Sequence, residues 1–277
     1  MAAMIRVCSL GWKASDALAR SGGSARVFAA LSESIYLTAC DELLWLGRAG
    51  SPLHPRAMLT GGPLPFEADA LELDPDGVLP WTPPAPPRAC RPETLVAGVD
   101  ALVGTIRAIG APDGFGALLV GATPRFPLDR AADRARRLAG ACAADDPRAA
   151  ADAATELLGL GPGLTPSGDD YVGAAFFGKT LLAAAGACDR DAWARAGAVV
   201  LERAHRRTHP ISAALLGDLL DGHGHAPLHE LAGALAAGGD RRAALDTARR
   251  LVAIGHSSGW DMLAGFVAAF IAPPPAL

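Results

Sequence analysis

Hydrophobic positions recur at helical spacing through the C-terminal two thirds of the chain. After Pro92, the residues Leu95, Val99, Leu102 and Ile106 follow one another at steps of three and four, which places them on one face of an α-helix. The same periodicity predicts further helices at residues 128–143, 147–158, 171–187, 190–206, 211–220, 228–237, 241–254 and 260–272.

Short apolar runs bounded by polar turns characterise the first third of the chain. The segments Ala25–Leu31, Ser34–Thr38 and Glu42–Leu46 contain β-branched and aromatic residues, which favour strands. We therefore predict a small antiparallel sheet or barrel. Within the helical part, the run Phe115–Gly121 predicts one isolated strand.

A proline-rich segment separates these two patterns. Seven prolines lie between Pro75 and Pro92, and proline joins neither a helix interior nor the hydrogen-bond ladder of a sheet. The segment predicts two domains, a β-rich domain of residues 1–90 and an α-helical domain of residues 91–277. The predicted class is α+β, with the β-rich part packed on the mainly α-helical part.

Composition disfavours several functional classes. With 19% charged residues and a net charge of −4, the chain shows neither a disordered composition nor a basic nucleic-acid surface. The five cysteines are widely spaced, which disfavours a disulfide framework and a thiolate zinc site. Charged residues interrupt any signal-peptide run, and the apolar helices are too short to span a bilayer. We predict a cytoplasmic protein with no nucleic-acid or membrane partner.

A glycine- and proline-rich run at residues 159–170, GLGPGLTPSGDD, precedes the predicted helix 171–187. Its glycines permit positive φ and close approach of a ligand, and its prolines stiffen the turns. Four polar side chains stand where the free N–H groups of a helix start favour negative charge: Thr165, Ser167, Asp169 and Asp170. We predict that this loop is the functional centre.

Three interpretations of these polar residues remain open. In the first, Ser167 or Asp169 only caps the helix. In the second, Asp169 and Asp170 hold Mg²⁺ with a phosphate, because a phosphate alone would be repelled by the two carboxylates. In the third, a nitrogen such as a carbamoyl NH₂ donates hydrogen bonds to them. The Walker motif of P-loop enzymes is absent.

A second polar motif, GHSSGWDMLAG, occupies residues 255–265. His256 can exchange a proton near neutral pH, whereas Ser257, Ser258 and Asp261 can hydrogen-bond a polar ligand. Helix capping by Ser258 is the simpler alternative. Like the first motif, this one places Ser-Gly and then Asp at the start of an apolar helix, so the two turns can face one cavity.

A third motif, RRTHPIS, spans residues 206–212. Pro210 marks a helix boundary, and Thr208 stands at a natural capping position. Arg206 or Arg207 can bind a carboxylate or phosphate bidentately. The alternative is a solvated basic helix end.

At these three motifs the chain resembles a bacterial family, long of unknown function, that includes the AllH subunit of oxamate carbamoyltransferase from anaerobic allantoin breakdown, a branch of purine catabolism. The matching residues are Gly159–Asp170, Thr208 with Ile211 and Ser212, and Gly255–Asp261. The resemblance spans about residues 90–272.

The resemblance implies a transferase subunit. The AllH-type enzyme interconverts oxamate plus carbamoyl phosphate with oxalurate plus phosphate, and this subunit acts with two others, one of them similar to acyl-CoA synthetases. The carbamoyl-phosphate loop of aspartate and ornithine carbamoyltransferases is absent here, so carbamoyl transfer would use a different site.

We therefore predict a subunit of a carbamoyltransferase-like enzyme. Asp169 and Asp170 would bind the carbamoyl nitrogen or Mg²⁺, and His256 would transfer a proton. The predicted substrate-binding residues are Gly161, Gly163, Thr165, Ser167, Gly168, Arg207, Thr208, Ser212, Ser257, Ser258 and Asp261. We expect Asp169 or Asp170, Ser212 and His256 to lie around one cavity. The alternatives are a Mg²⁺-dependent nucleotide-binding or phosphoryl-transfer enzyme and a non-catalytic ligand-binding subunit.

Overall fold

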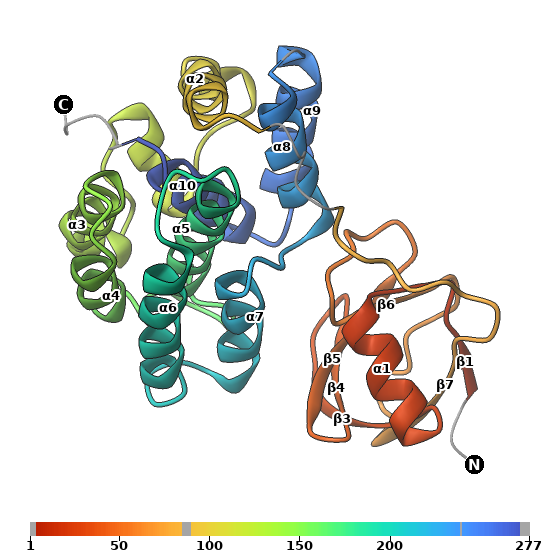
Figure 1. The fold of residues 1–277 in the computed structure, drawn as a ribbon. Coiled ribbons are helices and arrows are strands. Elements are labelled where there is room, and N and C mark those ends of the chain that lie inside the picture. The colour runs from red at the N-terminus through yellow and green to blue at the C-terminus, as the bar shows by residue number, and fades with distance from the viewer. Residues whose placement is uncertain (1–3, 85–89, 239, 272–277) are drawn as a thin grey trace. The chain divides into compact units, whose positions relative to one another are not determined.

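The computed structural model describes residues 4–84, 90–238 and 240–271. The chain divides into two compact units, Met1–Pro83 and Pro84–Leu277 (Figure 1). The first unit is mainly strand and the second mainly helix, which confirms the predicted α+β class. Residues 85–89 of the proline-rich segment lie outside the described residues.

The first unit is a curled sheet that contains seven strands within residues 4–84, in the order β1-β7-β3-β4-β5-β6-β2. The elements are β1 (Met4–Arg6), β2 (Ser9–Leu10), α1 (Trp12–Ser21), β3 (Ser24–Ala30), β4 (Ile35–Ala39), β5 (Glu42–Arg48), β6 (Ala57–Thr60) and β7 (Ala70–Asp74). The pairs β1–β7 and β5–β6 are parallel, so the sheet is mixed, whereas we expected an antiparallel one.

The predicted strands correspond to β3, β4 and β5. The hairpin between β4 and β5 turns through Cys40 and Asp41, which both have positive φ (48° and 63°). Positive φ at both central residues gives a turn whose backbone twist matches the right-handed twist of the flanking strands. The parallel pairs arise from β1 and β6, which are too short to show a clear two-residue period and were not predicted.

The second unit consists of helices around one apolar core. Its elements are α2 (Pro92–Val103), η1 (Ile106–Ala108), η2 (Gly114–Val120), η3 (Leu128–Ala131), α3 (Ala132–Ala143), α4 (Pro147–Thr155), α5 (Ser167–Ala184), α6 (Arg190–Ala204), α7 (Pro210–Leu220), α8 (Ala226–Ala237), α9 (Arg241–Val252) and α10 (Ser258–Ala268), where η marks a 3₁₀ helix. No helix among the described residues is long and apolar enough to cross a bilayer.

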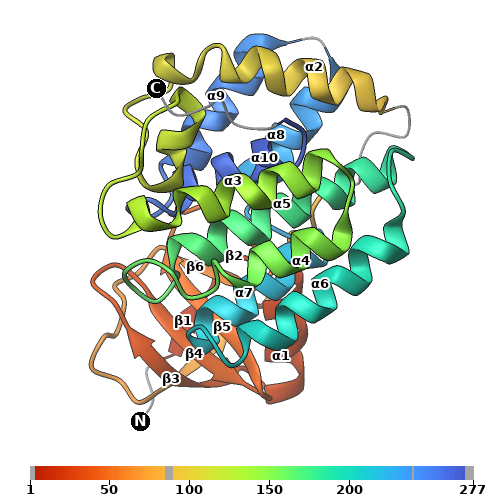
Figure 2. The same ribbon diagram turned by 90° about the vertical axis from the view of Figure 1, so that its left-hand side faces the viewer.

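Helices α5 and α10 lie against each other in the middle of this unit, enclosed by the other helices (Figures 1 and 2). Their close approach depends on small residues. A Cβ added at Gly265 would lie 2.0 Å from the carbonyl oxygen of Tyr171, and one at Gly178 would lie 2.4 Å from Cβ of Ala269. The two helix starts that carry the first and second motifs are therefore held in fixed register.

The predicted strand at Phe115–Gly121 is wrong, because these residues belong to the 3₁₀ helix η2. Phe115, Leu118 and Leu119 are buried at steps of three and four, which is helical spacing. The apolar run was too short for periodicity to distinguish the two states.

The starts of α5 and α10 also lie earlier than predicted, at Ser167 and Ser258. The N-cap residues are Pro166 and Ser257, and neither makes a side-chain capping hydrogen bond. The capping roles considered for Ser167, Asp169 and Ser258 are therefore wrong. At α7 the N-cap is His209, whose ring nitrogen accepts from the N–H of Ile211, and not Thr208.

Candidate functional site

The starts of α5 and α10 share one local design. Each helix begins with serine, then glycine, and has aspartate in fourth place (Asp170 and Asp261). A Cβ on Gly168 would lie 2.0 Å from the carbonyl oxygen of Leu157, and one on Gly259 would lie 2.0 Å from that of Leu251. Only glycine allows the end of the preceding helix to come so close. The similarity of the two motifs in sequence thus corresponds to a similarity in structure.

Hydroxyl groups connect the two helix starts. The oxygens of Thr165 and Ser258 lie 3.4 Å apart, and those of Ser167 and Ser257 lie 3.3 Å apart. Each pair joins residues about ninety positions apart in the chain. The first and second motifs therefore lie next to each other, and the common cavity expected between them stays a prediction.

Asp170 is a buried carboxyl group with one unpartnered oxygen. Its Oδ2 is inaccessible and has no hydrogen-bond partner among the described residues. Burial raises its pKa well above the ordinary value, and the nearby Asp261 and Asp169 carboxylates raise it further, against a hydrogen bond from Ser258 that lowers it. The group is thus displaced toward its neutral form.

Asp261 is the matching group on α10 and is 0% exposed. Its Oδ1 accepts a 2.6 Å hydrogen bond from the N–H of Phe115, whereas its buried Oδ2 has no hydrogen-bond partner within the described part of the chain. Burial raises the pKa of Asp261 to about 7, and the N–H of Phe115 and the Ser167 and Ser257 side chains oppose the shift. A carboxyl group with this pKa exchanges its proton near neutral pH.

Asp169 differs from its neighbour because protein donors occupy both of its oxygens. Oδ1 accepts from the N–H of Gly159 at 2.9 Å, and Oδ2 accepts from the hydroxyls of Thr208 and of Ser212, the latter at 2.7 Å. The side chain is 1% exposed. Asp169 thus ties the glycine-rich loop to the third motif at the start of α7.

The other predicted residues of the third motif lie next to the glycine-rich loop. The Arg207 side chain is exposed, and its guanidinium donates to the carbonyl oxygen of Thr155 at 2.7 Å. A Cβ on Gly159 would lie 2.3 Å from the carbonyl oxygen of Arg207, so the loop passes directly over this backbone. Arg207 and Thr208 therefore contact the loop without reaching the unpartnered carboxyl oxygens.

His256 lies at the rim of the site and not inside it. Its side chain is 97% exposed, and its Nε2 lies 3.7 Å from Oδ2 of Asp113. Asp113 is one of the charges that raise the pKa of Asp261, which places it near the buried carboxyl group. Of the three residues expected around one cavity, Asp169 and Ser212 are in direct contact, whereas the His256 side chain is exposed to solvent.

The start of η2, with its N-cap Asp113, lies next to Asp261 but was missed by the sequence analysis. Phe115 supplies the N–H on Asp261, and a Cβ on Gly114, which has φ of 52°, would lie 2.2 Å from Oδ1 of that aspartate. Asp113 caps η2 by accepting from the N–H of Gly114 at 2.8 Å. The run DGFG at 113–116 was the available signal, because Asp-Gly marks a turn with positive φ.

The chemistry of this arrangement suits a neutral N–H-bearing group of a ligand, such as an amide or carbamoyl. Two buried carboxyl groups each have one oxygen without a hydrogen-bond partner among the described residues, and serine hydroxyls lie next to both. In its ionised form each carboxyl accepts a hydrogen bond, and in its protonated form it donates one. Among the described residues, no group of three or more His, Cys, Asp or Glu side chains is placed to hold a metal ion.

Residues 157–270 match the model of a protein family described as oxamate carbamoyltransferase subunit AllH. The match contains all three motifs and confirms the family resemblance that they indicate. No curated protein and no solved structure matches the chain.

Proposed function

We propose that this chain, related over residues 157–270 to the oxamate carbamoyltransferase subunit AllH, is a subunit of a carbamoyltransferase-type complex and binds a small carbamoyl- or amide-bearing substrate between the starts of α5 and α10. The family description refers to a carbamoyltransferase subunit, which implies further subunits. By the resemblance, one of these partners would be similar to acyl-CoA synthetases.

The observation that carries the proposal is the pair of unpartnered oxygens on Asp170 and Asp261. A buried polar atom without a hydrogen-bond partner costs about 1–3 kcal/mol. Two such atoms in one site therefore support the proposal that a ligand supplies the missing hydrogen bonds. A carbamoyl or amide NH₂ offers two N–H donors, which suits two acceptor oxygens. A phosphate in the same place would meet two carboxyl groups without an intervening cation.

The remaining polar groups have supporting roles in this proposal. The hydroxyls of Thr165, Ser167, Ser257 and Ser258 position the substrate. Asp169 is a positioning residue, because its oxygens already accept hydrogen bonds from the loop and from α7. Because protein donors already occupy both oxygens of Asp169, the alternative in which Asp169 and Asp170 hold Mg²⁺ has less support.

Glycines give the loop its shape against the start of α5, and His256 is the proposed proton-transfer residue. Gly161 and Gly163 have φ of 123° and 87°, which are conformations that other residues rarely adopt. A Cβ on Gly161 would lie 2.7 Å from the N–H nitrogen of Ser167. In the proposal, His256 is the candidate for proton transfer at the rim of the site, beside Asp113.

The test is calorimetric titration of oxamate and of carbamoyl phosphate into the wild-type protein and Asp170→Asn. Asn keeps the size of the side chain but replaces one carboxyl oxygen with an NH₂ group that cannot accept a hydrogen bond, so we expect binding to weaken about ten- to a hundredfold. Asp133→Asn is the matched control, since the Asp133 side chain is exposed.

Two results would contradict the proposal. One is equal affinity of wild type and Asp170→Asn for both compounds. The other is a protein that binds neither compound but binds Mg²⁺-nucleotide and loses it in Asp170→Asn, which would favour the phosphoryl-transfer alternative.

A further inference from the structure

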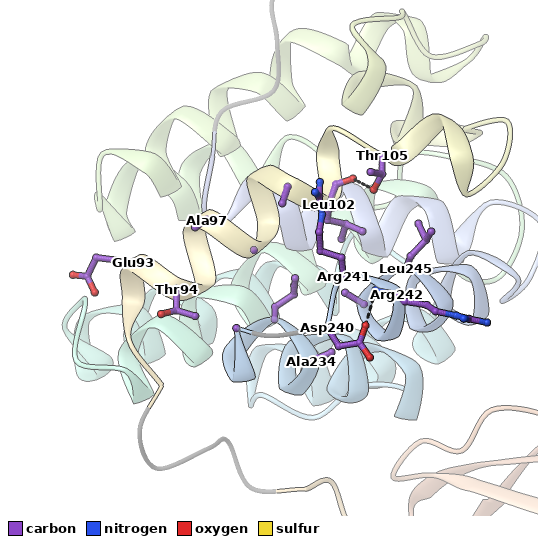
Figure 3. Close-up of a pocket in the computed structure, with 15 residues that line it drawn as sticks. Glu93, Thr94, Ala97, Leu102, Thr105, Ala234, Asp240, Arg241, Arg242 and Leu245 are labelled. Atoms are coloured by element: carbon purple, nitrogen blue, oxygen red, sulfur yellow. Dashed lines mark hydrogen bonds between the residues drawn. The ribbon is translucent and has the colours of Figure 1, made fainter.

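A cavity of about 580 Å³ lies between α2, α8 and α9, among residues that belong to none of the three motifs (Figure 3). Its volume falls in the range of sites that enclose small organic molecules. The cavity arises from small side chains on facing helices, Ala97 and Ala101 on α2 and Ala234 on α8. Beside them a Cβ on Gly98 would lie 3.1 Å from Cδ2 of Leu235, so α2 and α8 touch there and the space opens alongside.

The two ends of this cavity carry opposite charge. Glu93 lies in the first turn of α2, and Arg241 begins α9 near the other end of α2. Figure 3 shows the Arg241 side chain extending toward Leu102. From Glu93 to Val103, α2 rises about 15 Å. An elongated molecule lying along α2 would therefore meet a negative charge at one end and a positive charge at the other.

Arg241 is available to a ligand. No ion pair or hydrogen bond to its side chain occurs within the described residues, and the nearby Asp240 carboxylate accepts from the N–H groups of Arg242 and Ala243, at 2.8 and 3.1 Å. The Thr105 hydroxyl at the same end donates to the carbonyl oxygen of Leu102. At this end of the cavity, the Arg241 guanidinium is thus a charged group without a hydrogen-bond or ion-pair partner among the described residues.

We propose that the cavity binds an amphipathic carboxylate with a medium-length apolar chain. The apolar part packs against Ala97, Ala101 and Leu235, and the carboxylate pairs with Arg241. A single guanidinium matches one carboxylate in a bidentate pair, and Glu93 at the far end disfavours a second negative charge on the ligand. This site is separate from the proposed substrate site and does not depend on it.

The experiment uses the full chain and titrates octanoate, octylamine and octyl phosphate by calorimetry. Arg241→Gln removes the charge at the cavity end. Arg242→Gln is the matched control, because Arg242 also lines the cavity but extends away from Arg241 in Figure 3, and its Nε lies 3.8 Å from the Asp246 carboxylate. Ala101→Phe fills the cavity. Both arginines are exposed, so neither substitution disturbs the core.

We expect wild type and Arg242→Gln to bind octanoate alike, Arg241→Gln to bind about tenfold or more weakly, and Ala101→Phe to lose binding. Octylamine should not bind, and octyl phosphate should bind more weakly than octanoate. The proposal is overturned if wild type does not bind octanoate, if both arginine variants lose affinity equally, or if octylamine binds as well as octanoate. It is also overturned if Ala101→Phe keeps its affinity while remaining folded by circular dichroism.

Discussion

The N–H of Phe115 donates a 2.6 Å hydrogen bond to Oδ1 of Asp261, although 146 positions separate the two residues. The approach is possible because Gly114 has no side chain where it passes Oδ1 of the aspartate. Oδ1 of Asp261 therefore has a fixed hydrogen-bond partner, whereas the buried Oδ2 has none among the described residues. The orientation of this buried carboxyl group depends on η2 as well as on α10.

The raised pKa of Asp261 predicts that the folded protein loses stability as pH rises. With a folded pKa of about 7 against 3.8 unfolded, the folded state binds more protons in between, so the stabilisation is complete below pH 4 and lost as pH rises through 7. Asp261→Asn should reduce the loss between pH 5 and pH 8 by an amount on the order of 2 kcal/mol. The measurement is urea unfolding of both proteins at the two pH values.

Two histidines act in the opposite direction and make the comparison of variants necessary. Burial lowers the pKa of His225 and of His229 to about 4, so their contribution to stability is lost as pH falls from about 6.5 toward 4. This effect is common to wild type and Asp261→Asn and cancels in the difference. An identical pH dependence in both proteins would show that Asp261 does not titrate as described.

Asp169→Ala should destabilise the protein by about 3 kcal/mol. The substitution leaves the N–H of Gly159 and the hydroxyls of Thr208 and Ser212 without their acceptor, and buried donors without partners are costly. Asp133→Ala, at an exposed helix position, should change stability by less than about 0.5 kcal/mol. Urea unfolding measures both, and similar losses would refute the structural role of Asp169.

Two glycine substitutions should distinguish the effect of close packing from that of helix propensity. Gly259 is the second residue of α10, and Gly140 lies within α3. Gly259→Ala places a Cβ 2.0 Å from a backbone oxygen, so α9 and α10 must move apart, and we expect a loss of more than about 3 kcal/mol or failure to fold. Gly140→Ala, in α3 with nothing within 4 Å of the added Cβ, should instead gain about 0.5–1 kcal/mol. Melting temperatures of the two variants should shift in opposite directions, and a tolerated Gly259→Ala would argue against the close contact.

The buried Lys179 should respond unequally to loss of its partner and loss of its charge. Its side chain is 4% exposed, its Nζ lies 2.8 Å from Oδ1 of Asp145, and it stands 4.5 Å above the Trp193 ring. Asp145→Ala leaves the buried cation without its counter-ion and should cost about 2–3 kcal/mol, whereas Lys179→Met should cost less because no charge remains buried. The measurement is urea unfolding of both variants. A larger loss of stability in Lys179→Met than in Asp145→Ala would contradict this prediction.

By itself the sequence determined the local features of this protein. The three- and four-residue spacing predicted α2 and the later helices, and the β-branched runs predicted β3, β4 and β5, because such periods follow from the geometry of a single element. The polar motifs likewise identified Asp170, Asp261 and the serines before them as candidates. Short elements such as β1, β6 and η2 escaped, since a few residues carry too little periodicity.

Only the tertiary structure decided which of these candidates act together and in what role. Asp169 and Asp170 are adjacent and chemically identical, yet consecutive residues on a helix point about 100° apart. One therefore meets the Thr208 and Ser212 hydroxyls and the other meets Ser258. That division depends on how α5 packs against α7 and α10, and contacts between residues tens of positions apart leave no periodic signal in a single sequence.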